Sequence, residues 1–352
     1  MFLLINLPVV TWADGNQWAK YSGNPVIAPT AGAWDADYVA QPRVLFDGVQ
    51  YRMWYVGSSQ KATAIGFANS TDGVAWTKTP GPVLTPGSHD AWDGAFIGLG
   101  SVVWDGSQFL MWYVGAGYTS FQTGAVGLAT SPDGINWGKY AGNPVLRPSS
   151  IDQRLITTPY VIKPAGSPLY NMWYAARRLA DPPSSSVLRI IYATSLDGIT
   201  WDKFATPALS PSNEPSAWDS GSVYAPSVFY DNYSRTFGMW YTGLSQASIV
   251  PSIGFATSKD GITFTNSTIS PFLTQTPGAW DSGGVENQDV VLTPTGLTIY
   301  YDGISVNAGN KIGLARAPQG FAIPEFPASN TVLILTVLMT LMIPLIRKRK
   351  KN

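Results

Sequence analysis

A three-residue phrase recurs five times along the chain and constrains the fold more than any other feature. It reads Met-Trp-Tyr in the first four copies and Ile-Tyr-Tyr in the fifth. The copies occupy residues 53–55, 111–113, 172–174, 239–241 and 299–301. Repeats of roughly 60 residues that each hold several short strands are typical of radial or stacked repeat architectures. The sequence therefore predicts five copies of one structural unit.

Two further phrases mark the repeats. Ahead of each triplet stands Trp-Asp, with a weaker Ile-Asp copy in the third repeat, and after it comes an Asp-Gly turn followed by an aromatic residue. The shared Asp residues are Asp35, Asp93, Asp152, Asp219 and Asp281, and the turns begin at Asp72, Asp133, Asp197 and Asp260. Five equivalent positions cannot all contact one ligand, so we expect these residues to stabilise the repeats. Function is expected where one repeat departs from the others.

Each repeat is predicted to form four strands. The first follows Trp-Asp, as in residues 39–46, and an Asp-Gly turn leads into the aromatic second strand. The third, as in residues 64–68, has a central Gly that we expect to lie under a Trp ring. No helical periodicity is sustained before the C-terminal tail. The sequence predicts an all-β, five-bladed β-propeller over residues 14–318, a single domain because no repeat can bury its own faces.

The N-terminal residues are predicted to close the ring. Residues 14–26 nearly duplicate 133–145, which form the end of the second repeat. The fifth repeat stops after Ala317 without its Asp-Gly turn and fourth strand. We therefore expect the segment with Trp18 to pair beside residues 312–314 and supply the missing strand. Such closure removes the exposed edges that an open array would leave.

Composition narrows the chemistry. The chain has no Cys and one His, His89, which excludes disulfides, thiolate metal sites, multi-His zinc sites and most Ser-His-Asp arrangements. No cofactor is predicted, and a metal, if bound, would be a hard cation such as Ca²⁺ held by carboxylates and carbonyls. The 22 basic residues include five in the tail, so the rest has 17 against 22 acidic residues, a net charge of −5. This acidic body argues against a nucleic-acid partner.

The tail predicts a membrane anchor. Residues 331–346 are uncharged and would span about 24 Å as a helix, close to a bilayer core. The linker 319–330 precedes them, and the basic residues 347–352 would stay in the cytoplasm, leaving the propeller at the cell surface. Residues 1–13 are interpreted as a truncated signal peptide. Pro324-Glu325-Phe326 resembles the C-terminal sorting signals of archaeal surface proteins. The alternative is a buried helix with a solvated basic end.

The order of these phrases resembles the five-bladed glycoside hydrolase superfamily. Trp-Asp, x-Pro-x-Val, Tyr-x-Met-Trp-Tyr and Ile-Gly-x-Ala-x-Ser-x-Asp-Gly-x-x-Trp follow one another across residues 14–318. The superfamily includes the arabinanase and xylosidase family 43, the invertase-type family 32 and the mannoside phosphorylase family 130. Family 43 would place an acidic residue at three positions that here hold Gln41, Thr158 and Tyr224. Gln cannot take a proton at neutral pH, so that mechanism is not available as written.

Other polar departures offer an alternative site. Asp37 stands where the other repeats have Ala, Arg or Gly, and Glu286 and Asp289 occur in the first strand of the fifth repeat. We predict Glu286 as general acid, with Asp37 or Asp289 as base. The predicted substrate-binding residues are Gln41, Arg43, Arg154, Arg177, Tyr224 and Asn287. The alternative is a set of ion pairs lining a wet channel.

Three functions stay open. The first is an extracellular, membrane-anchored propeller that acts on a glycan or oligosaccharide, a candidate glycoside hydrolase. The second is a non-catalytic carbohydrate-binding module, for which aromatic loop residues such as Tyr118 and Phe121 are suited. The third is a structural or adhesive surface protein, because propellers also bind proteins.

Overall fold

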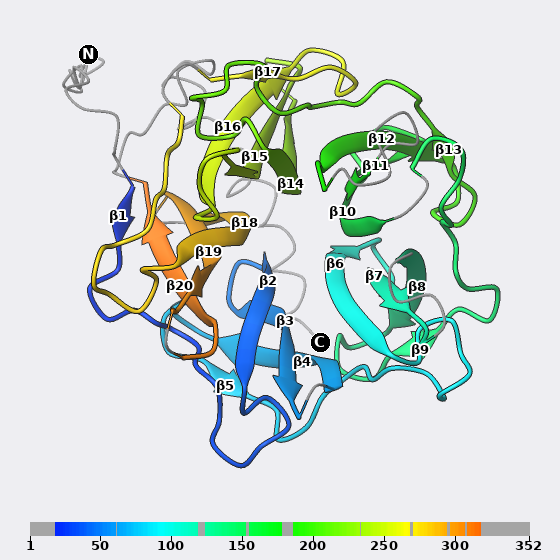
Figure 1. The fold of residues 1–352 in the computed structure, drawn as a ribbon. Helices are drawn as coiled ribbons and strands as arrows, with labels where there is room; N and C mark the ends of the chain where they lie inside the picture. Colours follow the sequence, from blue (N-terminus) through cyan, green and yellow to red (C-terminus); the bar gives the residue numbers. More distant parts are fainter. Residues whose placement is uncertain are drawn as a thin grey trace, which may run out of the picture.

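The computed structural model describes residues 18–317 apart from short gaps at 61, 119–123, 153–154, 178–185, 233, 268–269, 294–295 and 307. These residues form five four-stranded antiparallel sheets arranged as blades around a central axis (Figure 1). The predicted all-β five-bladed propeller is confirmed. The predicted signal peptide, linker, anchor helix and basic tail lie outside the described residues. Within the described part, no helix is long and apolar enough to cross a membrane.

The four strands of a blade run from the axis outward. The inner strands are β2 (Tyr38–Phe46), β6 (Phe96–Trp104), β10 (Ile156–Ile162), β14 (Ser222–Asp231) and β18 (Gly284–Thr293). The second strands are β3 (Tyr51–Ser59), β7 (Phe109–Ala116), β11 (Tyr170–Ala176), β15 (Thr236–Leu244) and β19 (Gly296–Ile304). The third strands are β4 (Ala62–Ser70), β8 (Ala125–Ser131), β12 (Arg189–Ser195), β16 (Ser252–Ser258) and β20 (Lys311–Arg316). The fourth strands are β5 (Thr77–Lys78), β9 (Gly138–Lys139), β13 (Asp202–Lys203), β17 (Thr265–Asn266) and β1 (Ala19–Lys20).

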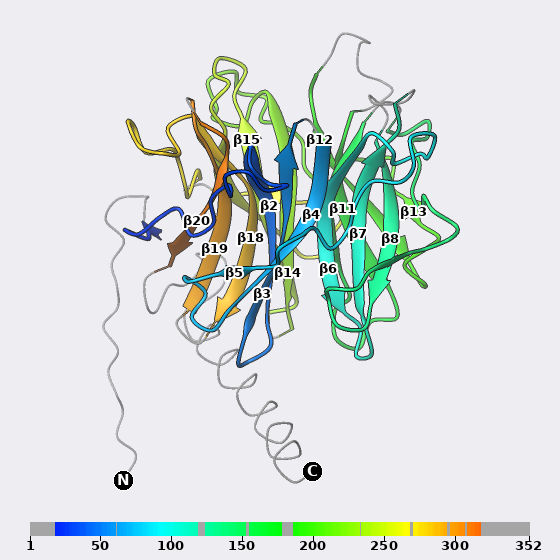
Figure 2. The same ribbon diagram turned by 90° about the horizontal axis from the view of Figure 1, so that it is seen from below.

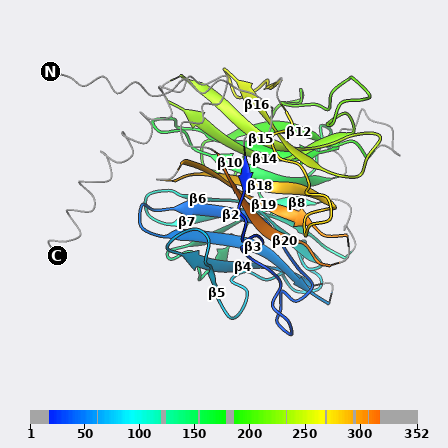
Figure 3. The ribbon, with the colours of Figure 1, turned by 90° about the vertical axis from the view of Figure 1, so that its left-hand side faces the viewer.

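The N-terminal segment completes the last blade, as predicted. β1 pairs with β20, where Ala19 lies opposite Arg316, and Ile27 forms a further bridge to Ile312. Figure 3 shows β18, β19 and β20 between the blade of β2 and the blade of β14. Trp18 is buried and meets Trp240 of the fourth blade edge to face, at 6.3 Å between ring centroids. The two ends of the propeller are therefore joined by backbone pairing and by the core.

The shared Asp of each repeat ties its own blade together. Asp35 is buried, lies 2.7 Å from Lys78 Nζ on the fourth strand and accepts a hydrogen bond from Tyr55 of the second. The same contacts recur at Asp93, Asp152 and Asp281, whose lysines are Lys139, Lys203 and Lys20, while Asp219 uses Asn266. In the last blade this bond joins residue 20 to residue 281 and so helps to close the ring. The prediction that these Asp residues serve the scaffold is confirmed.

The triplet Trp joins each blade to the next. Trp54 Nε1 donates to the Gly134 carbonyl in the turn of the second blade at 2.7 Å. Trp112, Trp173 and Tyr300 make the corresponding bonds to Gly198, Gly261 and Gly73. The Asp of each turn holds it in shape, since Asp133 Oδ1 accepts two backbone N–H bonds at 2.8 Å. The apolar clusters likewise span neighbouring blades, so the core lies between blades and continues around the ring.

The Gly of the third strand has the predicted packing role. A Cβ at Gly66 would meet the Trp34 ring at 2.7 Å, closer than atoms can approach. The equivalent glycines of the second, fourth and fifth blades lie against Trp92, Trp218 and Trp280 in the same way. The Trp of the Trp-Asp phrase thus covers the third strand of its own blade. Figure 2, turned from Figure 1, shows the strands running along the height of the disc.

Candidate functional site

The inner strands surround the propeller axis, and each contains a β-bulge. The register shifts between residues 40 and 43, 99 and 101, 157 and 160, 224 and 227, and 286 and 289. Each bulge sets one extra residue against the second strand. Residues three apart would face opposite sides of a regular strand, but the extra residue returns them to the same side. Glu286 and Asp289 therefore share one face of β18.

The bulges impose a left-handed backbone on residues other than glycine. Gln41, Thr158, Ala225 and Asn287 have φ values of 53°, 46°, 49° and 51°. Such conformations are sparsely populated by residues with a Cβ and persist where the surroundings hold them. The same strained position in four blades indicates that the propeller itself selects it. It lies near the end of the channel where the inner strands begin, which we call the entry end.

Polar links join neighbouring blades at the level of the bulges. In each described link, a bulge N–H donates to a side chain of the preceding blade. Gln41 N donates to Asp302 Oδ1 (2.7 Å), Leu99 N to Gln41 Oε1 (2.9 Å), Ala225 N to Thr158 Oγ1 (3.1 Å) and Asn287 N to Thr242 Oγ1 (3.2 Å). Buried amides need such partners. We call these contacts the bulge ring.

A layer of side chains closes the channel below the bulge ring. It consists of the residue that follows the bulge in each blade: Arg43, Ser101, Tyr160, Ser227 and Asp289. Asp289 accepts bonds from Val44 N at 2.6 Å, Tyr160 Oη at 3.1 Å and Ser227 Oγ at 3.3 Å. Because these donors come from three other blades, Asp289 is a meeting point of the ring. We call this layer the channel floor.

The charges of the floor are buried. Arg43 is 2 % exposed, bonds the carbonyls of Gly100, Pro42 and Gln288, and lies over the Tyr160 ring at 5.5 Å. Its Nη2 has no partner among the described residues. Burial raises the pKa of Asp289, opposed by the Arg43 charge and the bonds from Val44, Tyr160 and Ser227. Both residues thus contribute to closing the channel, and their predicted roles in catalysis and binding stay predictions.

Glu286 lies above the floor and is half-buried, so it keeps access to solvent. Tyr224 of the neighbouring blade donates from Oη to Glu286 Oε2 at 2.7 Å. Burial raises the pKa of Glu286, and the Tyr224 bond acts in the opposite direction. No other hydrogen bond to this carboxyl joins it to a described residue. Glu286 is therefore a carboxyl of raised pKa with an oxygen left for a ligand.

Asp302 stands directly opposite Glu286 on the paired strand β19. It is fully buried, accepts Gln41 N at 2.7 Å and accepts Asn287 Nδ2 at 2.9 Å. Burial and the Glu286 charge raise the pKa of Asp302 well above its usual range. Asp302 is not among the residues predicted from the sequence, because that prediction rested on departures in the first strands. The signal was present, since the residue after the triplet is Val56, Val114, Ala175 and Thr242 in the other blades and Asp only here.

The other predicted residues divide into two groups. Gln41, Tyr224 and Asn287 gather around the Glu286 and Asp302 carboxyls through the bonds given above. Asp37 is exposed at the entry end, next to β2, and accepts Gln60 N at 2.7 Å, so it caps a connection while remaining open to solvent. Arg177 follows β11 at the same end, and its Nε has no partner among the described residues. Arg154 lies outside the described residues.

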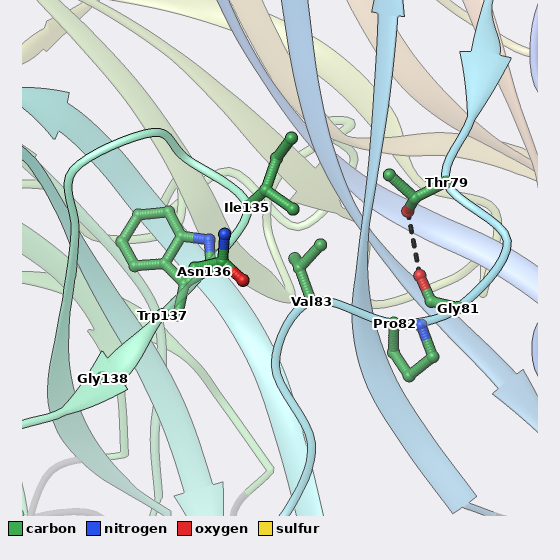
Figure 4. Close-up of a pocket in the computed structure, with 8 residues that line it drawn as sticks. All are labelled: Thr79, Gly81, Pro82, Val83, Ile135, Asn136, Trp137 and Gly138. Atoms are coloured by element: carbon green, nitrogen blue, oxygen red, sulfur yellow. Dashed lines mark hydrogen bonds between the residues drawn. The ribbon is translucent and has the colours of Figure 1, made fainter.

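A separate hollow of about 610 Å³ lies at the outer edge of the ring (Figure 4). It is bounded by Thr79, Gly81, Pro82, Val83, Ile135, Asn136, Trp137 and Gly138. These residues flank the fourth strands of the first two blades, away from the channel. Trp137 is tied down there, since its Nε1 donates to Gly134 O at 2.9 Å. Among the described residues, no group of three His, Cys, Asp or Glu side chains is placed to hold a metal ion.

The sequence relatives are distant. No family model matches the chain. An uncharacterized protein of Mycobacterium tuberculosis is 26% identical over 208 residues, which cover 58% of this chain and 66% of that protein. An A type blood N-acetyl-α-D-galactosamine deacetylase of Flavonifractor plautii is 30% identical over 151 residues, covering 39% of this chain but 19% of that enzyme. The chain thus spans less than two thirds of the length of these relatives.

The structural likeness is broader. A solved glycoside hydrolase superposes with a TM-score of 0.66 at 18% identity, covering 88% of this chain and 94% of that one. A member of the GH130 family of mannoside phosphorylases and glycoside hydrolases gives 0.63 at 17% identity, with 88% and 95% covered. A thermostable family-43 glycoside hydrolase gives 0.63 at 16% identity, with 82% and 91% covered. At these identities the likeness establishes the shared propeller fold.

Proposed function

We propose that the protein acts on glycans at the entry end of the channel, with Glu286 as the reactive carboxyl. The observation that carries the proposal is the position of Glu286. It is the acidic residue of the described inner strands that lies above the floor, keeps solvent access and has a raised pKa. A solvent-accessible carboxyl of raised pKa suits general acid catalysis near neutral pH. The fold shared with glycoside hydrolases supports a glycan as the substrate class.

In this proposal Glu286 donates a proton to the oxygen that leaves when a glycosidic bond is cleaved. Tyr224 fixes the orientation of the carboxyl through its bond to Oε2. Asp37, exposed at the entry end of the adjacent first blade, is the carboxylate open to act as base on a water molecule. A general acid and a general base acting from opposite sides of the bond are what an inverting glycosidase requires. The closed floor would limit the substrate to the upper part of the channel.

We further propose that the propeller works outside the cell, anchored by residues 331–346. The support is the uncharged span followed by the basic residues 347–352. The resemblance of residues 324–326 to archaeal sorting signals favours surface attachment.

The test is the substitution Glu286→Gln, which keeps the shape of the side chain and removes its proton. Wild type and variant are incubated with a panel of oligosaccharides. Turnover is measured from the reducing ends that are released, and binding is measured by titration calorimetry. We expect turnover to fall by about 10²- to 10⁴-fold while binding is retained. Asp289→Asn is the comparison in the channel floor. Any loss of turnover in this variant should be accompanied by a matching loss of protein stability. Wild-type binding without turnover of any oligosaccharide would contradict hydrolysis.

A specific observation favours one second candidate, a non-catalytic carbohydrate-binding module. Above the floor, the described inner strands present a single carboxylate, because Gln41, Thr158 and Tyr224 occupy the positions where family 43 resemblance would expect acids. A binding module needs hydrogen-bonding side chains and no second carboxylate. For this candidate, Glu286→Gln should change affinity without any turnover to lose.

A further inference from the structure

Asp302 differs in kind from the other acceptors of the bulge ring. The described links of the other blades use the amide oxygen of Gln41 and the hydroxyls of Thr158 and Thr242, all neutral. Among the described links, only the one from the fifth blade to the first uses a carboxylate. A hydroxyl satisfies the same N–H elsewhere in the ring, so joining the blades does not require an ionisable group. The carboxyl of Asp302 therefore calls for another explanation.

The cross-strand partner of Asp302, which is Glu286, supplies an explanation for this carboxyl. Glu286 and Asp302 are paired residues of β18 and β19, one half-buried and the other fully buried. Ionising both carboxyls would place two like charges at paired positions, one of them fully out of water, which is costly. One proton retained between them removes that cost. The two groups are then expected to titrate as a pair, with steps that belong to both.

The surroundings do not assign the proton to either member alone. Burial favours the neutral form of Asp302, but Gln41 N and Asn287 Nδ2, which can only donate, favour its charged form. Tyr224 favours the charged form of Glu286. The Arg43 charge lowers the pKa of Asp302, and the Glu286 charge raises it. The Asp302 charge in turn helps to raise the pKa of Tyr38 on β2. Asp289 is the remaining carboxyl of β18, and Arg43 and three hydrogen bonds compensate it in the floor.

We propose that Glu286 and Asp302 form one coupled acid that retains a shared proton at neutral pH, with Asp302 as a positioning residue. Glu286 is the member that faces the channel and delivers the proton, and Asp302 keeps that proton in the pair. The inference rests on the proposed function of Glu286 and deepens it. It assigns to Asp302 a role that the bulge ring alone does not require.

The chain allows a direct measurement of this pair. It has three glutamates, Glu214, Glu286 and Glu325. Full-length protein carrying ¹³C in the glutamate carboxyls, kept in detergent, gives three resonances, and Glu286→Gln identifies the one of interest. In the wild type we expect the Glu286 resonance to titrate in two steps, the upper one above neutral pH. No substrate is needed, so the result is independent of whether a glycan is turned over.

The deciding variant is Asp302→Thr, which installs the residue that the fourth blade holds at this position, Thr242. A Thr hydroxyl can accept Gln41 N as Thr242 accepts Asn287 N, so the ring is preserved while the carboxyl is lost. We expect the upper step to disappear, lowering the proton affinity of Glu286 near neutral pH by at least about tenfold. Thr242→Val is the matched control, because it breaks a neutral link of the same ring and should leave both steps in place.

The outcomes separate the two proposals. If Asp302→Thr leaves the Glu286 titration unchanged, or if Thr242→Val changes it equally, the coupled acid is refuted whatever the activity. If the upper step disappears only in Asp302→Thr, the pair is supported. The pair would then stand even if no oligosaccharide is hydrolysed, in which case the proposed catalytic function fails separately.

Discussion

At the scale of single residues, the β-bulge decides what each channel position can do. Glu286 and Asp289 are three residues apart and face the same side only because the bulge adds a residue between them. One then reaches the solvent-accessible space above the floor, while the other receives bonds from three blades. Two acidic residues that look equivalent in the sequence thus differ in environment. The register shift that separates them cannot be predicted from amino-acid composition.

Tyr224 offers a test of how the site tunes Glu286. Its hydroxyl stabilises the charged carboxylate, so Tyr224→Phe should raise the pKa of Glu286 further. A hydrogen bond to a charged group contributes about 1.5–3 kcal/mol, which corresponds to a shift of roughly 1–2 pH units. The midpoint of the upper step in the ¹³C titration of Glu286 reports this change. Tyr160→Phe, which removes a comparable bond to Asp289, should leave that midpoint in place, and an equal shift in both variants would contradict a direct effect of Tyr224.

At the scale of strands and blades, the repeated phrases were sufficient to predict the architecture. Each phrase makes a contact that recurs, such as Asp93 with Lys139 or Trp54 with the Gly134 carbonyl. The site was less predictable, because its links cross from blade to blade. Tyr160 reaches Asp289 from two blades away, and Asp302 acts from a second strand. A comparison of second strands would have identified Asp302, whereas the Tyr160 contact depends on closing the ring.

The contact between Lys20 and Asp281 should support the last blade. Asp281 is fully buried, and Lys20 Nζ reaches its carboxylate at 2.5 Å and Thr274 O at 2.6 Å. Lys20→Met leaves a buried charge with fewer partners, so we expect a loss of roughly 3 kcal/mol in the free energy of unfolding, measured in urea. Lys20→Asn should cost less, because Asn266 serves Asp219 in the fourth blade. Equal losses of stability in the two variants would show that a hydrogen bond donated to Asp281 contributes little.

At the scale of the whole molecule, the closed ring couples residues at the two ends of the described chain. β1 covers the outer edge of β20, and Ile27 belongs to an apolar cluster shared with the first blade. The bulge ring and the floor also depend on closure, since Gln41 and Val44 of the first blade bond Asp302 and Asp289 of the last. Loss of the N-terminal strand should therefore disturb the candidate site as well as expose the edge of β20.

Two deletions separate these effects. Removing residues 1–13 leaves the predicted propeller, residues 14–318, intact and should change the unfolding midpoint little. Removing residues 1–27 exposes the β20 edge and takes away Trp18 and Ile27, so we expect a large loss of stability and association through the open edge. Unfolding in urea and light scattering measure both outcomes. A peptide of residues 18–27 added in excess should restore the shorter protein; an unchanged midpoint without the peptide would contradict closure by β1.

The proposed anchor determines where the molecule works and can be tested without knowledge of its substrate. Residues 331–346 carry no charge, and the basic residues 347–352 follow directly. Transfer of such a span into a bilayer is favourable, so the full chain should sediment with membranes and need detergent for release. A chain truncated after Phe326 keeps all residues of the propeller and should appear in the soluble fraction with an unchanged unfolding midpoint. Protease added to intact cells should cleave the full chain outside. Recovery of the full chain as a soluble monomer without detergent would refute the anchor, and protection from external protease would refute the orientation.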